Sequence, residues 1–309
     1  TPPLRAGPAS TRWRYPPCFT PKWNSDAIFC ASTYTFADTQ SVINFIEEQQ
    51  PRWLAFLNGE HDLVEEIPYD LANLIVPNGK LAPIGAEQMR GADRRAQALG
   101  VSEDRLMEHA GTAVAAAVKA LAVDTDRWGK GPVVILAGPG NNGGDGYVAA
   151  RRLALNGGKV VVAVVANEAR PRGASAARNW DRIANDRGIA KVHAPVARDV
   201  AVFGQGIDKA SVIVDALLGT GVRGPLREPI RSAVEVVERA RRAGIPIVAV
   251  DTPTAVDLSS GEPSEPAVVA DLTVTFHRPK TGLLTRRGAA HAGRVLVAPI
   301  GIPLDADRG

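Results

Sequence analysis

Cysteine is almost absent from this chain of 309 residues, and no metal-binding spacing takes its place. Only Cys18 and Cys30 are present, which excludes the disulfide framework of a small secreted domain. The five histidines are scattered, without a Cys-x-x-Cys or His-Glu-x-x-His spacing, so we do not expect a zinc enzyme.

Long apolar runs and one-sided charge are missing as well. No uninterrupted apolar stretch approaches the roughly 18 residues of a membrane span, and residues 1–30 lack the basic start and apolar core of an export signal. The 36 basic and 33 acidic residues occur in mixed order, whereas nucleic-acid-binding proteins usually gather basic residues on one face. We therefore expect a soluble, cytoplasmic protein that binds neither membranes nor nucleic acid.

The composition of the chain changes near residue 83. Residues 1–82 contain both cysteines and most of the aromatic residues, and carry a net negative charge. The remainder is rich in Ala, Val and Gly and carries a net positive charge. This shift predicts an N-terminal extension of uncertain fold over 1–82 and a separate domain over 83–309.

Two runs near the end of the extension, QPRWLAFLNGEHDLVE at 50–65 and PNGKLAP at 77–83, resemble part of the periplasmic oligopeptide-type solute-binding proteins. The resemblance implies an internal fragment, because the ligand-binding lobes of that family are far longer. A lineage-specific extension is the alternative interpretation.

From residue 87 onward, apolar strands alternate with helices. Strands are expected at 133–137, 159–165, 211–215, 246–250, 271–276 and 294–298, and helices at 87–99, 103–121, 146–156, 174–187 and 226–243. The alternation predicts an α/β fold in three layers, with helices on both faces of a mostly parallel sheet. Ligands bind such sheets at the carboxyl ends of the strands.

A glycine-rich segment, GPGNNGGDG at 138–146, follows the first strand. Glycine permits positive φ and a close approach of ligand to backbone, and the next helix offers unpaired N–H groups to an anion. We interpret the segment as a phosphate-binding loop rather than a simple tight turn. It lacks the Gly-Lys-Ser/Thr of a Walker A loop and the G-x-G-x-x-G of dinucleotide-binding enzymes, which argues against a nicotinamide dehydrogenase.

Two further strands end in aspartate, Asp215 and Asp251, and a fourth continues to Lys280. A single Asp at a strand end is usually a helix cap or a turn former. Two of them beside two glycine-rich segments favour a shared site in one crevice.

Together these motifs resemble the NAD(P)HX epimerase family, the YjeF N-terminal domain. The resemblance spans about 87–303 and rests on GPGNNGGDG, VDALLGTG at 214–221, VDTP at 250–253, PKTGLL at 279–284 and the lead-in QMRGADR at 88–94. It implies a Rossmann-like fold, often a homodimer, that interconverts the R and S epimers of hydrated NADH and NADPH. A separate NAD(P)HX dehydratase is then expected to complete the repair.

The resemblance also implies roles for single residues. The implied substrate contacts are Asn141, Asn142, Gly143, Gly144, Asp145, Gly219, Thr220, Gly221, Val222, Arg223, Gly224, Pro225 and Asp251. Asn142, Asp215 and Thr254 are implied to hold a potassium ion (K+), for which amide, carboxylate and hydroxyl oxygens are suitable ligands.

Asp251 is the expected acid/base group. Inverting a carbinolamine carbon requires the hydroxyl to leave, or the ring to open, and then to return from the other face, so one group beside the ring could serve both directions. Lys280 is the second catalytic candidate; its alternative is an exposed lysine in a Pro-Lys turn.

Two residues depart from the family pattern. Ala255 replaces the Gly of Asp-x-Pro-Ser-Gly-Leu-Asp, where a conformation suited to Gly would cost Ala about 1 kcal/mol or more. His277 stands where a small residue is common. These changes put activity rather than fold in doubt, and the alternative function is a non-catalytic nucleotide-binding or assembly module of the same fold.

Overall fold

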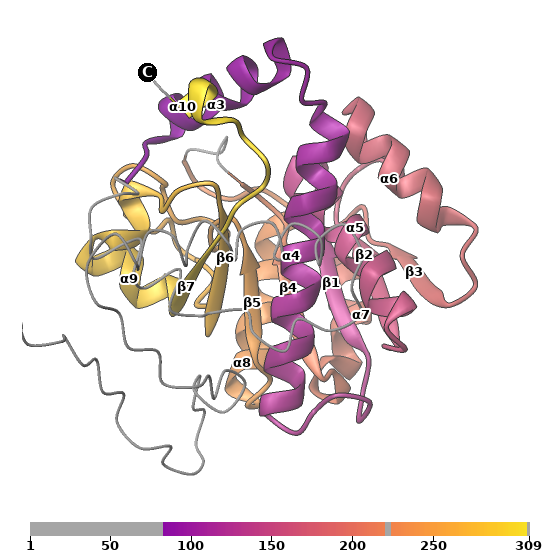
Figure 1. Ribbon diagram of the computed structural model, residues 1–309. Helices are drawn as coiled ribbons and strands as arrows, with labels where there is room; N and C mark the ends of the chain where they lie inside the picture. The colour runs from indigo at the N-terminus through magenta and orange to yellow at the C-terminus, as the bar shows by residue number, and fades with distance from the viewer. Residues whose placement is uncertain (1–82, 220–223, 308–309) are drawn as a thin grey trace, which may run out of the picture. The chain divides into compact units, whose positions relative to one another are not determined.

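The computed structural model describes residues 83–219 and 224–307 (Figure 1). The extension over 1–82 lies outside the described residues, and of the two runs that resemble solute-binding proteins only Pro83 is described. Its boundary with the domain therefore stays a prediction.

The described strands form one parallel sheet in the order β3-β2-β1-β4-β5-β6-β7. They are β1 (Val133–Ala137), β2 (Val160–Val164), β3 (Ile189–His193), β4 (Val212–Ala216), β5 (Ile247–Val250), β6 (Leu272–Phe276) and β7 (Arg294–Ala298). Strand β1 lies beside β4, although β2 and β3 come between them in the sequence. The strand order reverses at this point, which is where doubly wound sheets bind ligands.

Helices cover both faces of the sheet (Figure 1). They are α3 (Ala86–Ala98), α4 (Glu103–Asp124), α5 (Asn141–Leu155), α6 (Ala174–Ala184), α7 (Ala197–Phe203), α8 (Ile230–Arg242), α9 (Arg286–Ala292) and α10 (Leu304–Asp307), with 3-10 turns η2 (Gly204–Lys209) and η3 (Thr281–Leu284). Helices α4, α5 and α6 pack together, and α7 packs with α8. The predicted three-layer α/β fold is thus confirmed.

Alternation along the strands divides the core between the two faces. In β1, Val134 and Leu136 join the cluster that contains Val234 and Val237 of α8. Ile135, between them, faces Gly146 of α5. Successive side chains of a strand point to opposite faces, so a wholly apolar strand is what two helical layers require.

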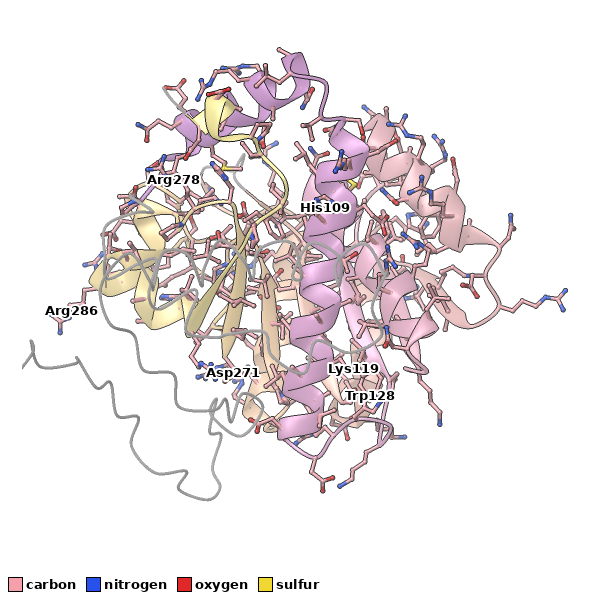
Figure 2. All side chains as sticks on the ribbon, in the orientation of Figure 1. His109, Lys119, Trp128, Asp271, Arg278 and Arg286 are labelled. Carbon is pink, nitrogen blue, oxygen red and sulfur yellow. The ribbon has the colours of Figure 1, made fainter. Side chains whose placement is uncertain are left out.

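Helix α4 is long and apolar enough to span a membrane by length and composition alone. In the domain, 72% of its most apolar 18-residue window is buried, which is typical of a central core helix. Figure 2 labels His109 and Lys119 on this helix, and Trp128. Near one end a ring nitrogen of His109 lies 2.9 Å from the carbonyl oxygen of Ile300, and near the other the ammonium of Lys119 lies 5.8 Å from the ring centroid of Trp128.

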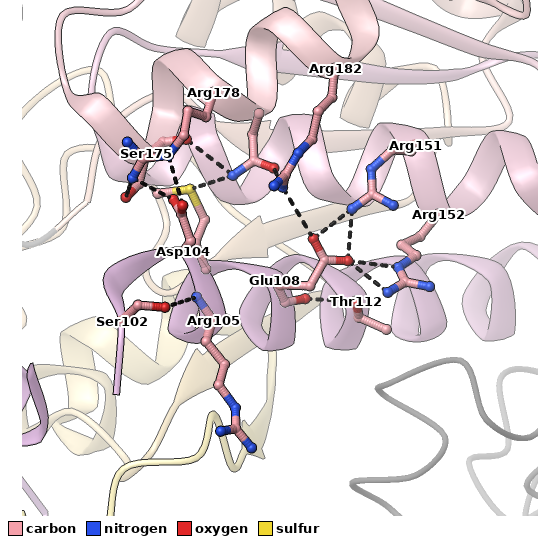
Figure 3. A network of polar contacts seen from close by, with 12 residues as sticks. Ser102, Asp104, Arg105, Glu108, Thr112, Arg151, Arg152, Ser175, Arg178 and Arg182 are labelled. Atoms are coloured by element: carbon pink, nitrogen blue, oxygen red, sulfur yellow. Dashed lines mark hydrogen bonds and ion pairs between the residues drawn. The ribbon is translucent and has the colours of Figure 1, made fainter. Parts of the chain in front are cut away.

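A polar network fastens α4 to α5 and α6 (Figure 3). The carboxylate of Glu108 on α4 lies 2.5 Å from Nη2 of Arg151 and accepts a 2.9 Å hydrogen bond from Nε of Arg152. Asp104 accepts two hydrogen bonds from Arg178 of α6. Burial raises the pKa of Glu108, but the arginine contacts outweigh it and lower the net pKa. The network therefore holds α5 in place, and α5 begins at the candidate site.

Candidate functional site

The glycine-rich segment is mostly helix, which corrects the prediction of a loop over 138–146. Helix α5 begins at Asn141, and none of the five glycines between 138 and 146 has a positive φ. A Cβ atom on Gly138 would lie 1.7 Å from the carbonyl oxygen of Leu217, and one on Gly143 would lie 2.1 Å from that of Gly138. These glycines therefore permit close packing of α5 over the strand ends. The N-terminus of α5, whose unpaired backbone N–H groups can bind a phosphate, lies within this segment.

The three residues implied to hold K+ lie in one buried hydrogen-bond network. Oδ1 of Asp215 accepts a 2.7 Å hydrogen bond from the hydroxyl of Thr254, and Oδ2 accepts one of 2.7 Å from its backbone N–H. The backbone N–H of Leu218 donates to that hydroxyl at 3.1 Å, and its carbonyl accepts from Nδ2 of Asn142 at 3.1 Å. The three residues that the resemblance implied as K+ ligands are therefore linked in the fold.

The chemistry of this group fits a hard monovalent cation. Its side chains offer a carboxylate, an amide and a hydroxyl, and Asp215 and Thr254 are completely buried. Burial raises the pKa of Asp215 to about 6, although hydrogen bonds from Thr254 and Leu217 act in the other direction. Within 83–219 and 224–307, no group of three or more His, Cys, Asp or Glu residues could hold a metal ion.

Asp251 and Lys280 form an ion pair at the carboxyl ends of β5 and β6. Nζ of Lys280 lies 2.9 Å from Oδ1 of Asp251, and it donates to the hydroxyl of Thr275 at 3.1 Å and the carbonyl of Phe276 at 2.8 Å. Lys280 has no exposed surface, so its alternative interpretation as an exposed turn lysine is wrong. Asp251 has φ 62°, a strained conformation of the kind that clusters at functional sites.

Helix α3 adds a carboxylate that the sequence analysis did not assign to the site. Burial raises the pKa of Asp93 to about 6, the charge of Lys280 lowers it and the charge of Asp251 raises it further. The helix is held there because Ile84 pairs with the backbone on either side of Lys280, through hydrogen bonds of 2.9 and 3.1 Å. Asp93 belongs to the motif QMRGADR at 88–94, and this motif was the signal in the sequence that could have assigned Asp93 to the site.

The implied substrate contacts on the second glycine-rich segment are only partly described. Thr220, Gly221, Val222 and Arg223 lie outside the described residues. Gly219 packs against Asn142, with 2.4 Å between its would-be Cβ and Oδ1, while Gly224 and Pro225 are exposed. A pocket of about 440 Å³ adjoins this segment and is lined by Gly224, Leu226, Ala255, Asp257, Ser260, Glu262, Pro263 and Ser264.

Both departures from the family pattern fall at left-handed backbone positions. Ala255 has φ 74° and His277 has φ 65°, which explains why small residues are common there. Ala255 therefore has the Gly-like backbone conformation that the sequence predicted for this position. The imidazole of His277 lies 2.8 Å from the carboxylate of Asp307, so this side chain has a partner on α10.

Replacing Ala255 by Gly should stabilise the protein. Glycine adopts φ 74° without the penalty of a Cβ atom, and the gain exceeds the entropy that glycine adds to the unfolded chain, leaving about 0.5–1 kcal/mol. Urea denaturation would measure the change in the free energy of unfolding. As a matched control, Ala154→Gly within α5 should destabilise by about 1 kcal/mol. Equal losses in the two variants would contradict the strain at Ala255.

Fold and site together define the class: a doubly wound α/β protein with a buried polar site at the switch point of its sheet. A family model described as YjeF-related protein N-terminus matches residues 103–282. The NAD(P)H-hydrate epimerase of Cenarchaeum symbiosum is 35% identical over 226 residues, which cover 73% of this chain and 98% of that protein. The chain therefore belongs to the family of YjeF-related N-terminal domains.

Two further comparisons concern a longer relative and a solved structure of lower sequence identity. The bifunctional NAD(P)H-hydrate repair enzyme Nnr of Pyrobaculum aerophilum is 40% identical over 220 residues, covering 71% of this chain and 42% of that enzyme. This chain thus spans less than half the length of that bifunctional relative. The crystal structure of yeast ynu0 aligns with a TM-score of 0.60 at 27% identity, over 73% of this chain and 92% of the yeast chain.

Proposed function

We propose that this chain is an isomerase that interconverts the R and S epimers of NADHX and NADPHX. The observation that carries the proposal is the buried Asp251–Lys280 ion pair at the carboxyl ends of β5 and β6, next to the oxygen cluster of Asn142, Asp215 and Thr254. The names of its relatives, NAD(P)H-hydrate epimerase and bifunctional NAD(P)H-hydrate repair enzyme, support the same activity.

In this proposal the site performs acid/base chemistry on a carbinolamine. Asp251 exchanges a proton with the ring hydroxyl or with the water that replaces it, and Lys280 holds the Asp251 carboxylate in position. Backbone N–H groups at the start of α5 bind the pyrophosphate, which anchors the substrate beyond the reacting ring.

The proposal is tested with an unequal mixture of R and S NADHX. Epimer-resolved chromatography should show that the protein brings the two epimers to their equilibrium ratio faster than they reach it spontaneously. A non-catalytic module would bind NADHX and leave the epimer ratio on its spontaneous course. Asp145, Asp215 and Lys280 all lie buried at the site, which favours the enzyme over the module.

We further propose that K+ binds to Asn142, Asp215 and Thr254. The ion would supply fixed positive charge in a buried oxygen cluster whose only carboxylate is Asp215. The Nnr relatives are named as bifunctional repair enzymes. We propose that this protein acts together with a separate dehydratase and that it forms a homodimer.

Asp215→Ala should remove the response to K+. A ligand present at about 100 times its Kd stabilises the folded state by about 2.7 kcal/mol, so KCl should raise the melting temperature of the wild type relative to tetramethylammonium chloride. The variant should show no such difference and should bind NADHX more weakly. Asp215→Asn, which keeps the shape of the side chain, serves as a check on folding. An unchanged K+ response in both variants removes Asp215 from the cation site.

A further inference from the structure

Asp145 is a buried carboxylate without a hydrogen-bond donor among the described residues. It lies in the second turn of α5 and is 7% exposed. Buried polar groups are bonded in most proteins, so a buried carboxylate without a donor calls for an explanation. Burial raises its pKa well above the usual range, and the charges of Asp251, Asp93 and Glu103 raise it further.

The elements that carry Asp145 and Asp251 lie on either side of β4, and the charges of the two residues interact. Asp145 belongs to the helix that follows β1, Asp251 ends β5, and β4 lies between these two strands. The start of α5 is bound to the end of β5, because Nδ2 of Asn142 donates a 2.8 Å hydrogen bond to the carbonyl of Val250.

The two carboxyl groups have opposite surroundings. Asp251 has the ammonium of Lys280 at 2.9 Å and accepts a 3.1 Å hydrogen bond from Thr275. Within 83–219 and 224–307, no ammonium group or hydrogen-bond donor contacts the Asp145 carboxyl group, and the charged groups that act on it, Asp251, Asp93 and Glu103, are acidic. Different surroundings can divide the roles of acid and base between two neighbouring carboxyl groups.

We propose that Asp145 is a second catalytic residue, a carboxylic acid that acts across the substrate ring from Asp251. This inference rests on the proposed epimerase function and replaces the single acid/base group with two. Each group serves one face of the carbinolamine carbon, so inversion needs no rotation of the substrate within the site.

The step balances without any co-reactant. Asp145 gives its proton to the ring hydroxyl, the C–O bond breaks, and water leaves with the electron pair while the ring nitrogen lone pair forms a C=N bond. A water molecule on the opposite face then attacks the carbon and gives a proton to Asp251, and the C=N pair returns to nitrogen. The epimer is inverted, and one proton has passed from Asp145 to Asp251. The reverse reaction uses the two groups in exchanged roles.

The test follows oxygen exchange in single-epimer NADHX dissolved in ¹⁸O-water. The wild type should incorporate ¹⁸O and invert both epimers. Asp145→Asn and Asp251→Asn should each lose inversion by roughly 10²- to 10⁴-fold. Their residual incorporation of ¹⁸O should be confined to one epimer, and to opposite epimers in the two variants, because each keeps the group on one face only.

Asp124→Asn is the matched control. Burial also raises the pKa of Asp124, but this residue ends α4 at the end opposite Glu103; the variant should exchange and invert both epimers as the wild type does. Thermal unfolding checks that Asp145→Asn, which keeps the size of the side chain, remains folded.

Two results for Asp145→Asn overturn the inference: inversion at the wild-type rate, or an equal loss of ¹⁸O incorporation from both epimers, which would indicate a role in binding. A wild type that leaves both epimers at their spontaneous rates contradicts the proposed function itself.

Discussion

Asp251→Asn should slow enzyme-catalysed epimer exchange by roughly 10²- to 10⁴-fold, the range typical of general acid–base groups. Asparagine keeps the size and polarity of the side chain but cannot exchange a proton at neutral pH. The hydrogen bond from Thr275 to Oδ1 can persist, so the strained backbone at this position retains a side-chain contact. Epimer-resolved chromatography measures the exchange, and titration with NADHX measures binding, which should largely persist.

The variant leaves Lys280 without its counter-ion, so urea denaturation must show that the protein is folded at the assay temperature. Loss of binding with turnover of the bound fraction unchanged would make Asp251 an anchor for the substrate rather than an acid/base group. Exchange at the wild-type rate would show that the mechanism is wrong even though the family membership stands.

The strands of the sheet were largely predictable from sequence, and the exception has a physical cause. Strands β1 and β7 match their predicted ranges of 133–137 and 294–298. Strand β3 was missed: it lies at the edge of the sheet, and its Lys191 and His193 interrupt the apolar pattern that marks a strand covered on both sides.

The start of α5 was mispredicted because local preference and tertiary packing disagree there. Glycine costs about 1 kcal/mol per residue in a helix interior relative to Ala, so a run of glycines indicates a loop. In the fold, any side chain at Gly144 would meet Met107 at 2.6 Å, and one at Gly146 would meet Ala216 at 2.9 Å. Contacts between elements distant in sequence therefore decide the conformation.

The site shows the same division between pattern and packing. The strand-end motifs indicated that Asp215 and Asp251 share a crevice, and the order β1-β4-β5-β6 confirms that the four motif-bearing strands are neighbours. Burial could not be predicted in this way. The burial of Asp145, which has no hydrogen-bond donor in the part of the chain that the structure describes, and the complete burial of Lys280 depend on how α3, α5 and the strand ends pack together.

Lys280→Gln should lower the free energy of unfolding by about 3–5 kcal/mol, as expected when one partner of a buried ion pair is removed. The ammonium is completely buried and has three oxygen partners within 3.1 Å, on Asp251, Thr275 and Phe276. Glutamine is too short to reach all three, and the Asp251 carboxylate would remain buried without its counter-ion. Urea denaturation at neutral pH measures the loss.

A double-mutant cycle separates the ion pair from the packing of the lysine stem. Starting from Asp251→Asn, the same Lys280→Gln change should cost less than it does in the wild type, because no carboxylate is left uncompensated; contacting charged residues typically couple by about 0.5–3 kcal/mol. Equal costs in both backgrounds would mean that Lys280 stabilises the fold through its hydrogen bonds to Thr275 and Phe276 alone. The 2.9 Å contact with Asp251 would then contribute nothing to stability, and Lys280 would not hold the acid/base group in position.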